Sequence, residues 1–159
     1  MRPLILGLGN DLMGDDAIGL IAARKLAEEV PNMADVRCSS EHGMALMDLF
    51  VGYERAIIID AVAMPGMSPG RIIELVPDDL RAIPNPSPHY TGIPEMIKAA
   101  YELRLDFPDD IRIIGIEIND ACMIGSAVSK PVASALEKII YCVKAYLLWW
   151  QMADENRNN

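Results

Sequence analysis

This protein has few cysteines, little positive charge and no long apolar run, and each of these absences excludes a class of protein. Its three cysteines, Cys38, Cys122 and Cys142, are odd in number and form no CxxC pair, which favours reduced thiols in the cytoplasm over a disulfide framework. Lysine and arginine number 14 against 23 aspartates and glutamates, so the net charge is -9. That charge opposes the phosphate backbone of nucleic acid, and we expect no nucleic-acid partner.

The sequence also lacks the pattern of a membrane span or a secretory leader. Its longest apolar stretch, residues 139–150, is interrupted by Lys144 and is shorter than the roughly 20 residues that a bilayer requires. Strand-like residues begin at Pro3 without a basic stretch before them, so we expect no signal peptide and no membrane insertion. The length of 159 residues suits one domain, which we assign to residues 1–152, with a frayed polar tail at 153–159.

Several motifs of catalysis and nucleotide binding are missing. Gly7 and Gly9 follow the first predicted strand as in a dinucleotide-binding turn, but Leu12 stands where that turn needs a third glycine. The chain has no Gly-Lys-Ser/Thr loop, no HExxH pair, no GxSxG elbow and no cysteine with an evident histidine partner. These absences argue against nucleotide binding and against serine or cysteine nucleophilic catalysis.

What the sequence does contain is an alternation of segments rich in β-branched residues with segments of helical period. This pattern predicts an α/β fold with a largely parallel sheet. Strands are predicted at residues 4–9, 35–38, 55–60, 71–76 and 110–118, and helices at 17–30, 44–50 and 93–105. A last helix begins after Ser129, and its apolar stripe comprises Val132, Leu136, Ile139, Val143, Leu147 and Trp150. The proline-rich segment 77–92 is expected to lack regular structure.

Carboxylates lie where two of these strands end. Asp15 and Asp16 follow the first strand at the start of a helix, and Asp60 closes the most apolar predicted strand. Because the carboxyl ends of parallel strands meet at one edge of a sheet, Asp16 and Asp60 are expected on the same edge. A capping role at a helix start or turn explains each of these aspartates equally well, so capping and ligand binding both stay open.

The chain has two histidines, and either one suits a site with these carboxylates. His89 lies in the proline-rich segment just before a predicted helix, and His42 lies in segment 39–44. One imidazole with Asp16 and Asp60 would make a three-ligand site with open positions, which suits a borderline divalent ion such as nickel or zinc. The sequence pattern does not choose between the two histidines.

Four segments, in the same order, resemble signatures of the hydrogenase maturation proteases, the endopeptidases that process the large subunit of nickel-iron hydrogenases. They are GLGNDLMGDDAIG (7–19), IIIDAV with GMSPG (57–70), SPHYTGIPEMIKAA (87–100) and GIEI with GSAVSKPVASAL (115–136). The resemblance implies a three-layer α/β/α domain with a mixed, mostly parallel twisted sheet. It also implies a metal-contacting trio at Asp16, Asp60 and His89, with Asp15 serving the helix start or orienting its neighbour.

The resemblance further implies a substrate, a nickel-loaded NiFe-hydrogenase large-subunit precursor from which a C-terminal extension is cut. Asp16, Asp60 and His89 would contact the nickel that this precursor supplies, so that only a loaded subunit is processed, and other divalent ions could occupy the same site. Whether the metal polarises the scissile carbonyl, activates water or serves only in recognition stays open. A non-hydrolytic nickel or loaded-subunit binding protein is the alternative.

Two segments depart from the family pattern. Many members carry Asp-Glu where this chain has Asp15 and Asp16, so the ligand arm is one methylene shorter and the metal is expected closer to the backbone. The segment after the second strand is often Asp-Gly-Gly-Thr-like, whereas here it reads Ser40-Glu41-His42-Gly43. This difference changes the expected shape of the substrate cleft.

Overall fold

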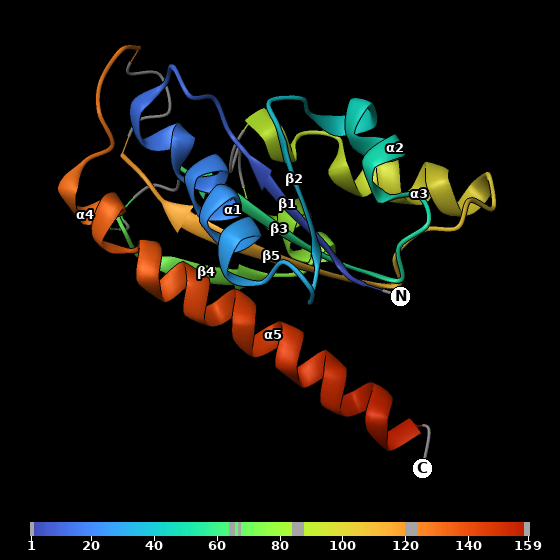
Figure 1. The fold of residues 1–159 in the computed structure, drawn as a ribbon. Coiled ribbons are helices and arrows are strands. Elements are labelled where there is room, and N and C mark those ends of the chain that lie inside the picture. Colours follow the sequence, from blue (N-terminus) through green and yellow to red (C-terminus); the bar gives the residue numbers. More distant parts are fainter. Residues whose placement is uncertain (1, 64–65, 67, 84–87, 120–123, 158–159) are drawn as a thin grey trace.

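The fold is built on one five-stranded sheet with strand order β2-β1-β3-β5-β4 (Figure 1). A computed structural model describes residues 2–63, 66, 68–83, 88–119 and 124–157. The strands are β1 (Leu4–Leu8), β2 (Asp35–Ser39), β3 (Arg55–Val62), β4 (Ile72–Leu75) and β5 (Asp110–Glu117). Neighbouring strands are parallel except for β4, which is antiparallel to β5 at the sheet edge. The prediction of a mixed, mostly parallel α/β sheet is confirmed.

Helices cover both faces of this sheet and give three layers (Figure 1). One face carries α1 (Ile18–Glu29), α4 (Lys130–Ser134) and α5 (Leu136–Arg157), and the other carries α2 (Met47–Phe50) and α3 (Ile93–Glu102). Short 3-10 helices lie in the connections at η1 (Gly14–Ala17), η2 (Gly43–Leu46), η3 (Pro77–Ala82) and η4 (Pro88–Tyr90). None of the described helices is long and apolar enough to cross a lipid bilayer.

Strand β3 supplies side chains to the apolar clusters on both faces. Ile57 and Ile59 pack in the layer of α1 and α5, whereas Ala56 and Ile58 pack in the layer of α2 and α3. A strand covered on both sides reads as a continuous apolar run rather than as an alternating one, because both of its faces are buried. The isoleucines of β3 therefore predicted its central place in the sheet correctly.

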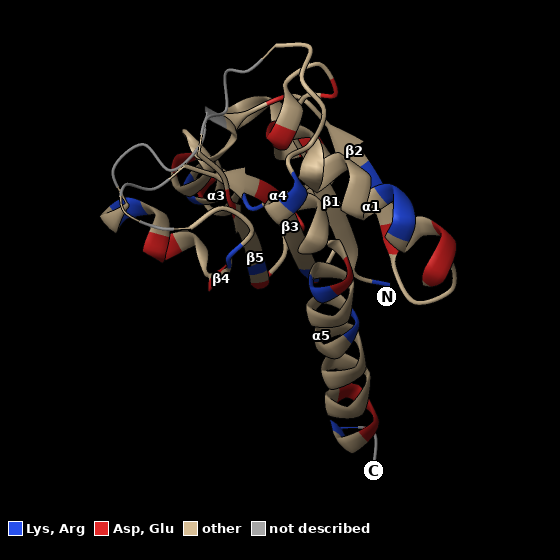
Figure 2. Ribbon diagram, turned by 90° about the vertical axis from the view of Figure 1, so that its left-hand side faces the viewer, with Lys and Arg blue, Asp and Glu red and all other residues tan. Residues whose placement is uncertain are grey.

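The last helix confirms its predicted stripe but not its predicted end. Val132, Ile139, Val143, Leu147 and Trp150 are buried against the sheet, and Leu136 is partly buried. Residues 153–157, expected to be frayed, continue α5, which projects beyond the sheet (Figures 1 and 2). The physical reason is a double hydrogen bond from the Arg55 guanidinium to the Asp154 carboxylate, at 2.6 and 2.9 Å, because such bidentate pairs fix geometry well.

The proline-rich segment 77–92 was expected to lack regular structure, and this expectation is wrong for η3 and η4. At η3, Pro77 occupies the first helical position, where its missing N–H costs nothing. The Asp79 carboxylate accepts a hydrogen bond from the Val76 backbone N–H at 2.9 Å. Proline at a helix start therefore favoured a helical turn here instead of preventing one.

Gly19 lets the start of α1 lie directly against the sheet. A Cβ atom at this position would lie 2.2 Å from the Leu8 carbonyl oxygen and 2.4 Å from the Ile59 carbonyl oxygen. Both obstacles are backbone atoms, which cannot rotate aside. The absence of a side chain at Gly19 therefore fixes the distance between α1 and the ends of β1 and β3.

We expect Gly19→Ala to destabilise the protein by about 1–3 kcal/mol or more, because the added methyl group overpacks the contact with the sheet. At an exposed helix position the same change stabilises a protein by up to about 1 kcal/mol. A loss of stability would therefore show that Gly19 is in close contact with the sheet. Urea unfolding measures the difference. Glu28→Ala, an exposed change on the same helix, is the control and should stay within about 0.5 kcal/mol of wild type.

Candidate metal centre

Asp16 is positioned by a tight turn after β1. In the turn η1, the Asp16 backbone N–H donates a hydrogen bond to the Met13 carbonyl oxygen at 3.1 Å. Gly9 has a φ of +146°, and a Cβ atom there would lie 2.1 Å from the Asp16 carbonyl oxygen. Gly9, one of the two glycines that suggested a nucleotide-binding turn, instead allows the backbone of η1 to fold closely over the end of β1.

Asp60 lies within β3 rather than at its end, because the strand continues to Val62. Its side chain is 0% exposed, and its Oδ1 atom accepts a hydrogen bond from the Ala61 backbone N–H at 2.8 Å. A buried carboxylate requires such donors or a cation nearby, because its charge has left water. The surrounding strand thus holds Asp60 in place without neutralising it.

His89 enters the site from η4, on the same face of the sheet as α3. Its Nδ1 atom lies 3.3 Å from the Glu41 carbonyl oxygen, and its Nε2 atom lies 3.4 Å from Asp16 Oδ2. A carbonyl oxygen only accepts hydrogen bonds, so Nδ1 carries a proton and Nε2 faces the carboxylate. A histidine oriented in this way by a backbone carbonyl presents Nε2 as a metal ligand.

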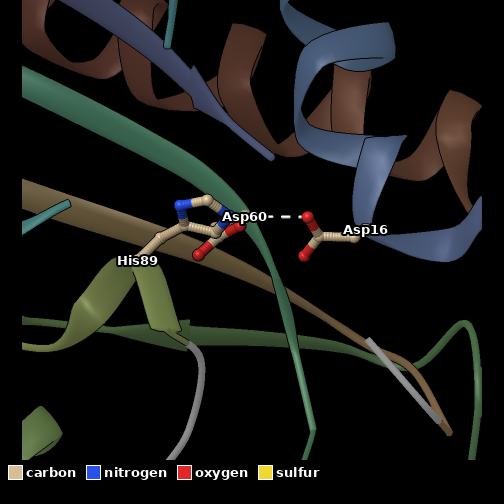
Figure 3. A group of neighbouring side chains, drawn as sticks. All are labelled: Asp16, Asp60 and His89. Atoms are coloured by element: carbon tan, nitrogen blue, oxygen red, sulfur yellow. Dashed lines mark hydrogen bonds and ion pairs between the residues drawn. The ribbon is translucent and has the colours of Figure 1, made fainter. Parts of the chain in front are cut away.

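The three side chains converge in the interior (Figure 3). Asp16, Asp60 and His89 are 5%, 0% and 7% exposed, and one ligand atom from each lies within 4.8 Å of the others. Burial alone would lower the pKa of His89. The hydrogen bond to Asp16 and the charges of Asp60 and Asp16 together outweigh this effect and raise the pKa from 6.5 to about 9. Two carboxylates around one imidazole therefore demand positive charge, either a proton on Nε2 or a cation.

Asp15 lies in the first turn of η1 and binds a residue far away in the sequence. Its carboxylate accepts hydrogen bonds from the backbone N–H and the hydroxyl of Ser129, at 2.6 and 2.9 Å. Neither η1 nor α1 has a side-chain hydrogen bond at its N-cap, so Asp15 and Asp16 are not helix caps. Asp15 instead ties the turn after β1 to the start of α4, and this contact supports the neighbouring Asp16.

The structure separates the two histidines clearly. His42 is exposed and lies outside the cluster, whereas His89 is buried inside it. The segment around His42 still contributes, because the carbonyl of Glu41 orients the His89 ring. That backbone contact was absent from the sequence-based picture, and no side-chain pattern signals it.

Tyr90 is a further buried polar group that the sequence did not single out. It is 2% exposed, and its hydroxyl has no hydrogen-bond partner among the described residues. Burial, and then the charge of Asp60, raise the pKa of Tyr90 well above its usual value. Tyr90 therefore stays neutral, and its hydroxyl can donate a hydrogen bond near Asp60.

The donor set fits a divalent cation. Two carboxylate oxygens and one imidazole nitrogen are ligands that nickel and zinc accept, and three protein ligands leave coordination positions for a substrate. The fold and this cluster together define a three-layer α/β protein with a buried candidate site for a divalent cation at the carboxyl edge of its sheet.

The comparisons with known proteins agree on one family. The family model for hydrogenase maturation protease matches residues 40–145. The chain is 24% identical over 151 residues to hydrogenase 2 maturation protease of Escherichia coli, covering 91% of this chain and 92% of that protein. It is 28% identical over 163 residues to the hydrogenase expression/formation protein HupD of Bradyrhizobium diazoefficiens, covering 99% and 83%.

Solved structures give the same answer. The maturating endopeptidase HybD from Escherichia coli superposes with a TM-score of 0.78 at 26% identity over 92% of each chain. The [NiFe] hydrogenase maturation protease HybD from Thermococcus kodakarensis gives 0.71 at 31% identity, covering 92% of this chain and 99% of that one. The chain belongs to the hydrogenase maturation protease family, and it is a peptide hydrolase.

In the metal-free protein we expect stability from His89 to decline as the pH rises. The pKa of His89 is about 9 in the folded state against an ordinary 6.5, so its contribution is complete below pH 6.5 and is lost as the pH passes 9. That contribution is up to about 3 kcal/mol. Urea unfolding of wild type and His89→Gln at pH 6 and pH 9.5 measures it as a difference that shrinks at high pH.

The exposed substitution His42→Gln is the control for this measurement and should follow wild type at both pH values. If the gap between wild type and His89→Gln were the same at pH 6 and pH 9.5, the ion pair between His89 and Asp16 would carry no net stabilisation.

Proposed function

We propose that this chain is the endopeptidase that removes the C-terminal extension of a nickel-loaded NiFe-hydrogenase large-subunit precursor. On this proposal Asp16, Asp60 and His89 are its metal-contacting and catalytic-site residues, and the nickel belongs to the precursor. The observation that carries the proposal is the convergence of these three buried side chains, with ligand atoms within 4.8 Å of one another. The family membership indicates the class of reaction, and the donor set indicates the kind of metal ion that the site would contact.

The metal would be recognised by charge and by geometry together. The positive charge that the carboxylates require is met by a proton on His89 in the metal-free protein. A nickel ion presented by the precursor would replace that proton, since ligands must be deprotonated before they bind a metal. A precursor without nickel offers no such replacement, which favours processing of the loaded subunit alone.

The surface around the site suits a protein substrate. Leu12 and Ile124 are 71% and 80% exposed, and their loops are joined by a hydrogen bond from the Gly125 N–H to the Leu12 carbonyl oxygen at 2.8 Å. A cleft of about 380 Å³ is lined by Asp15, Asn119, Ser126 and Ser129 among others, and Asp15 and Ser126 follow these two loops closely in the sequence. Exposed apolar side chains near a cleft are typical of surfaces that bind a polypeptide.

The cytoplasm is the compartment we propose for this reaction. Cys38 and Cys142 are free thiols, which agrees with a reducing environment.

The most direct test replaces Asp16 and follows cleavage of a nickel-loaded precursor by mass. Asp16→Glu should retain much of the activity, because it keeps the anionic ligand. Asp16→Asn should lose most of it, about 100-fold or more, because the amide lacks the charge that a divalent ion prefers. Full cleavage by Asp16→Asn with an unchanged melting temperature would remove Asp16 from the site.

The same assay tests the class of the protein. A precursor that stays intact while it binds the wild-type chain would identify a non-hydrolytic nickel or loaded-subunit binding protein. Precursor without nickel is the matched control, and we expect it to remain uncut.

A comparison of the two histidines tests the assignment of the third ligand. His89→Ala should abolish most precursor cleavage, because it removes the imidazole that faces Asp16. His42→Ala should have a small effect, because that side chain is exposed and lies outside the cluster. Steady-state cleavage rates of both variants give the ranking, and the reverse order would mean that His42 is the functional histidine.

A further inference from the structure

Glu117 is a buried carboxylate that the proposed metal contacts do not use. It is 1% exposed, and its Oε2 atom has no hydrogen-bond partner among the described residues. Together with the Tyr90 hydroxyl, it is one of two such side-chain atoms in the described part of the chain. An unpaired buried carboxylate oxygen is costly, so its presence calls for an explanation beyond packing.

The register of the sheet places Glu117 on the same face as Asp60. On β3, Ile58 and Val62 belong to the cluster under α3 and share that face with Asp60. On β5, Ile113 belongs to the same cluster, and strand alternation puts Glu117 on its side. This is also the face from which His89 enters.

Glu117 and Asp60 are diagonal neighbours on adjacent strands. Val62 pairs with Glu117, and Asp60 pairs with Gly115. Because Gly115 has no side chain, nothing from β5 stands beside Asp60 at its own level. Diagonal positions on adjacent strands lie about 7–8 Å apart, so the two carboxylates lie at neighbouring levels of the same sheet face, with the Val62 and Ile73 side chains packed over Gly115.

Peptide hydrolysis needs an acceptor for the proton of the attacking water. Asp16, Asp60 and His89 suit that role poorly on the proposed function, because the charge of a bound divalent ion lowers the proton affinity of its ligands. Glu117 is a carboxylate on the same face that is not among the proposed ligands. A water molecule is also the smallest partner that would satisfy its unpaired oxygen.

We propose, resting on the proposed function above, that Glu117 binds the attacking water and accepts its proton. The water oxygen then forms a bond to the scissile carbonyl carbon while one of its protons passes to the Glu117 carboxylate. When the C–N bond breaks, that proton passes to the leaving amine nitrogen. The carboxylate is thereby restored, and the products are one carboxylic acid and one amine.

Glu117→Gln tests this role with binding and stability measured beside cleavage. We expect kcat for nickel-loaded precursor to fall about 100-fold or more, the usual range for removal of a general base. KM for the precursor should stay within about twofold, and the melting temperature should not fall, because the substitution removes an unpaired buried charge. If Glu117 had a merely structural role, Glu117→Gln would lower the melting temperature and leave kcat near the wild-type value.

Glu74→Gln is the matched control. Glu74 is an exposed glutamate on β4 that accepts a hydrogen bond from the Tyr146 hydroxyl of α5, on the opposite layer. The Glu74→Gln substitution should leave kcat unchanged. If Glu117→Gln fails to fold, Glu117→Asp replaces it: the shorter arm withdraws the carboxylate from the water, so kcat should fall by at least about tenfold.

The outcomes separate the two proposals. Wild-type cleavage with an equally active Glu117→Gln would overturn the role of Glu117 and leave the endopeptidase proposal intact. No cleavage of loaded precursor by the wild-type chain would overturn the endopeptidase proposal itself, and the role of Glu117 with it.

Discussion

Two carboxylates buried beside one imidazole impose the constraint on which the rest of this site depends. Asp16 and Asp60 carry negative charge in a region almost without solvent, so positive charge has to be present there. The metal-free protein meets this need with a proton on His89, because the Asp16 hydrogen bond and the charges of Asp60 and Asp16 raise the pKa of His89 to about 9 although burial alone would lower it. Either a proton on His89 or a bound metal cation can therefore provide the positive charge that the site requires.

Much of the surrounding fold serves to hold these charges in place. Gly9 lets η1 fold onto the end of β1, and Gly19 lets α1 lie on the carbonyl oxygens of β1 and β3. Asp15 fastens the same turn to the start of α4 through Ser129. Because the turn is fixed at several points, Asp16 keeps its direction toward His89 despite the short arm of an aspartate. Preorganisation of this kind reduces the cost of arranging ligands when a metal arrives.

The sequence predicted the sheet and the convergence of the site, because both follow from simple periodicities. Consecutive isoleucines in β3 indicated a central strand, and the edge rule for parallel strands brought Asp16 and Asp60 together. It did not predict that β4 runs antiparallel, since a short strand carries no directional signal. The choice of His89 over His42 came from the family resemblance and not from periodicity, whereas the pairing of Asp15 with Ser129 depended on the fold. Glu117 was open to the argument used for Asp60, because it too is a carboxylate in an apolar strand.

The balance between proton and cation bears on how a maturation protease of this kind would avoid acting too early. A site that held its own metal tightly would have its charge satisfied before any substrate arrived. A site with three protein ligands, two of them short carboxylates, leaves the coordination shell open and stays protonated instead. On the proposed function, the metal then arrives with the precursor, and its binding both neutralises the carboxylates and aligns the polypeptide that carries it. The charge that makes the empty site unfavourable is thus the same charge that favours the loaded substrate.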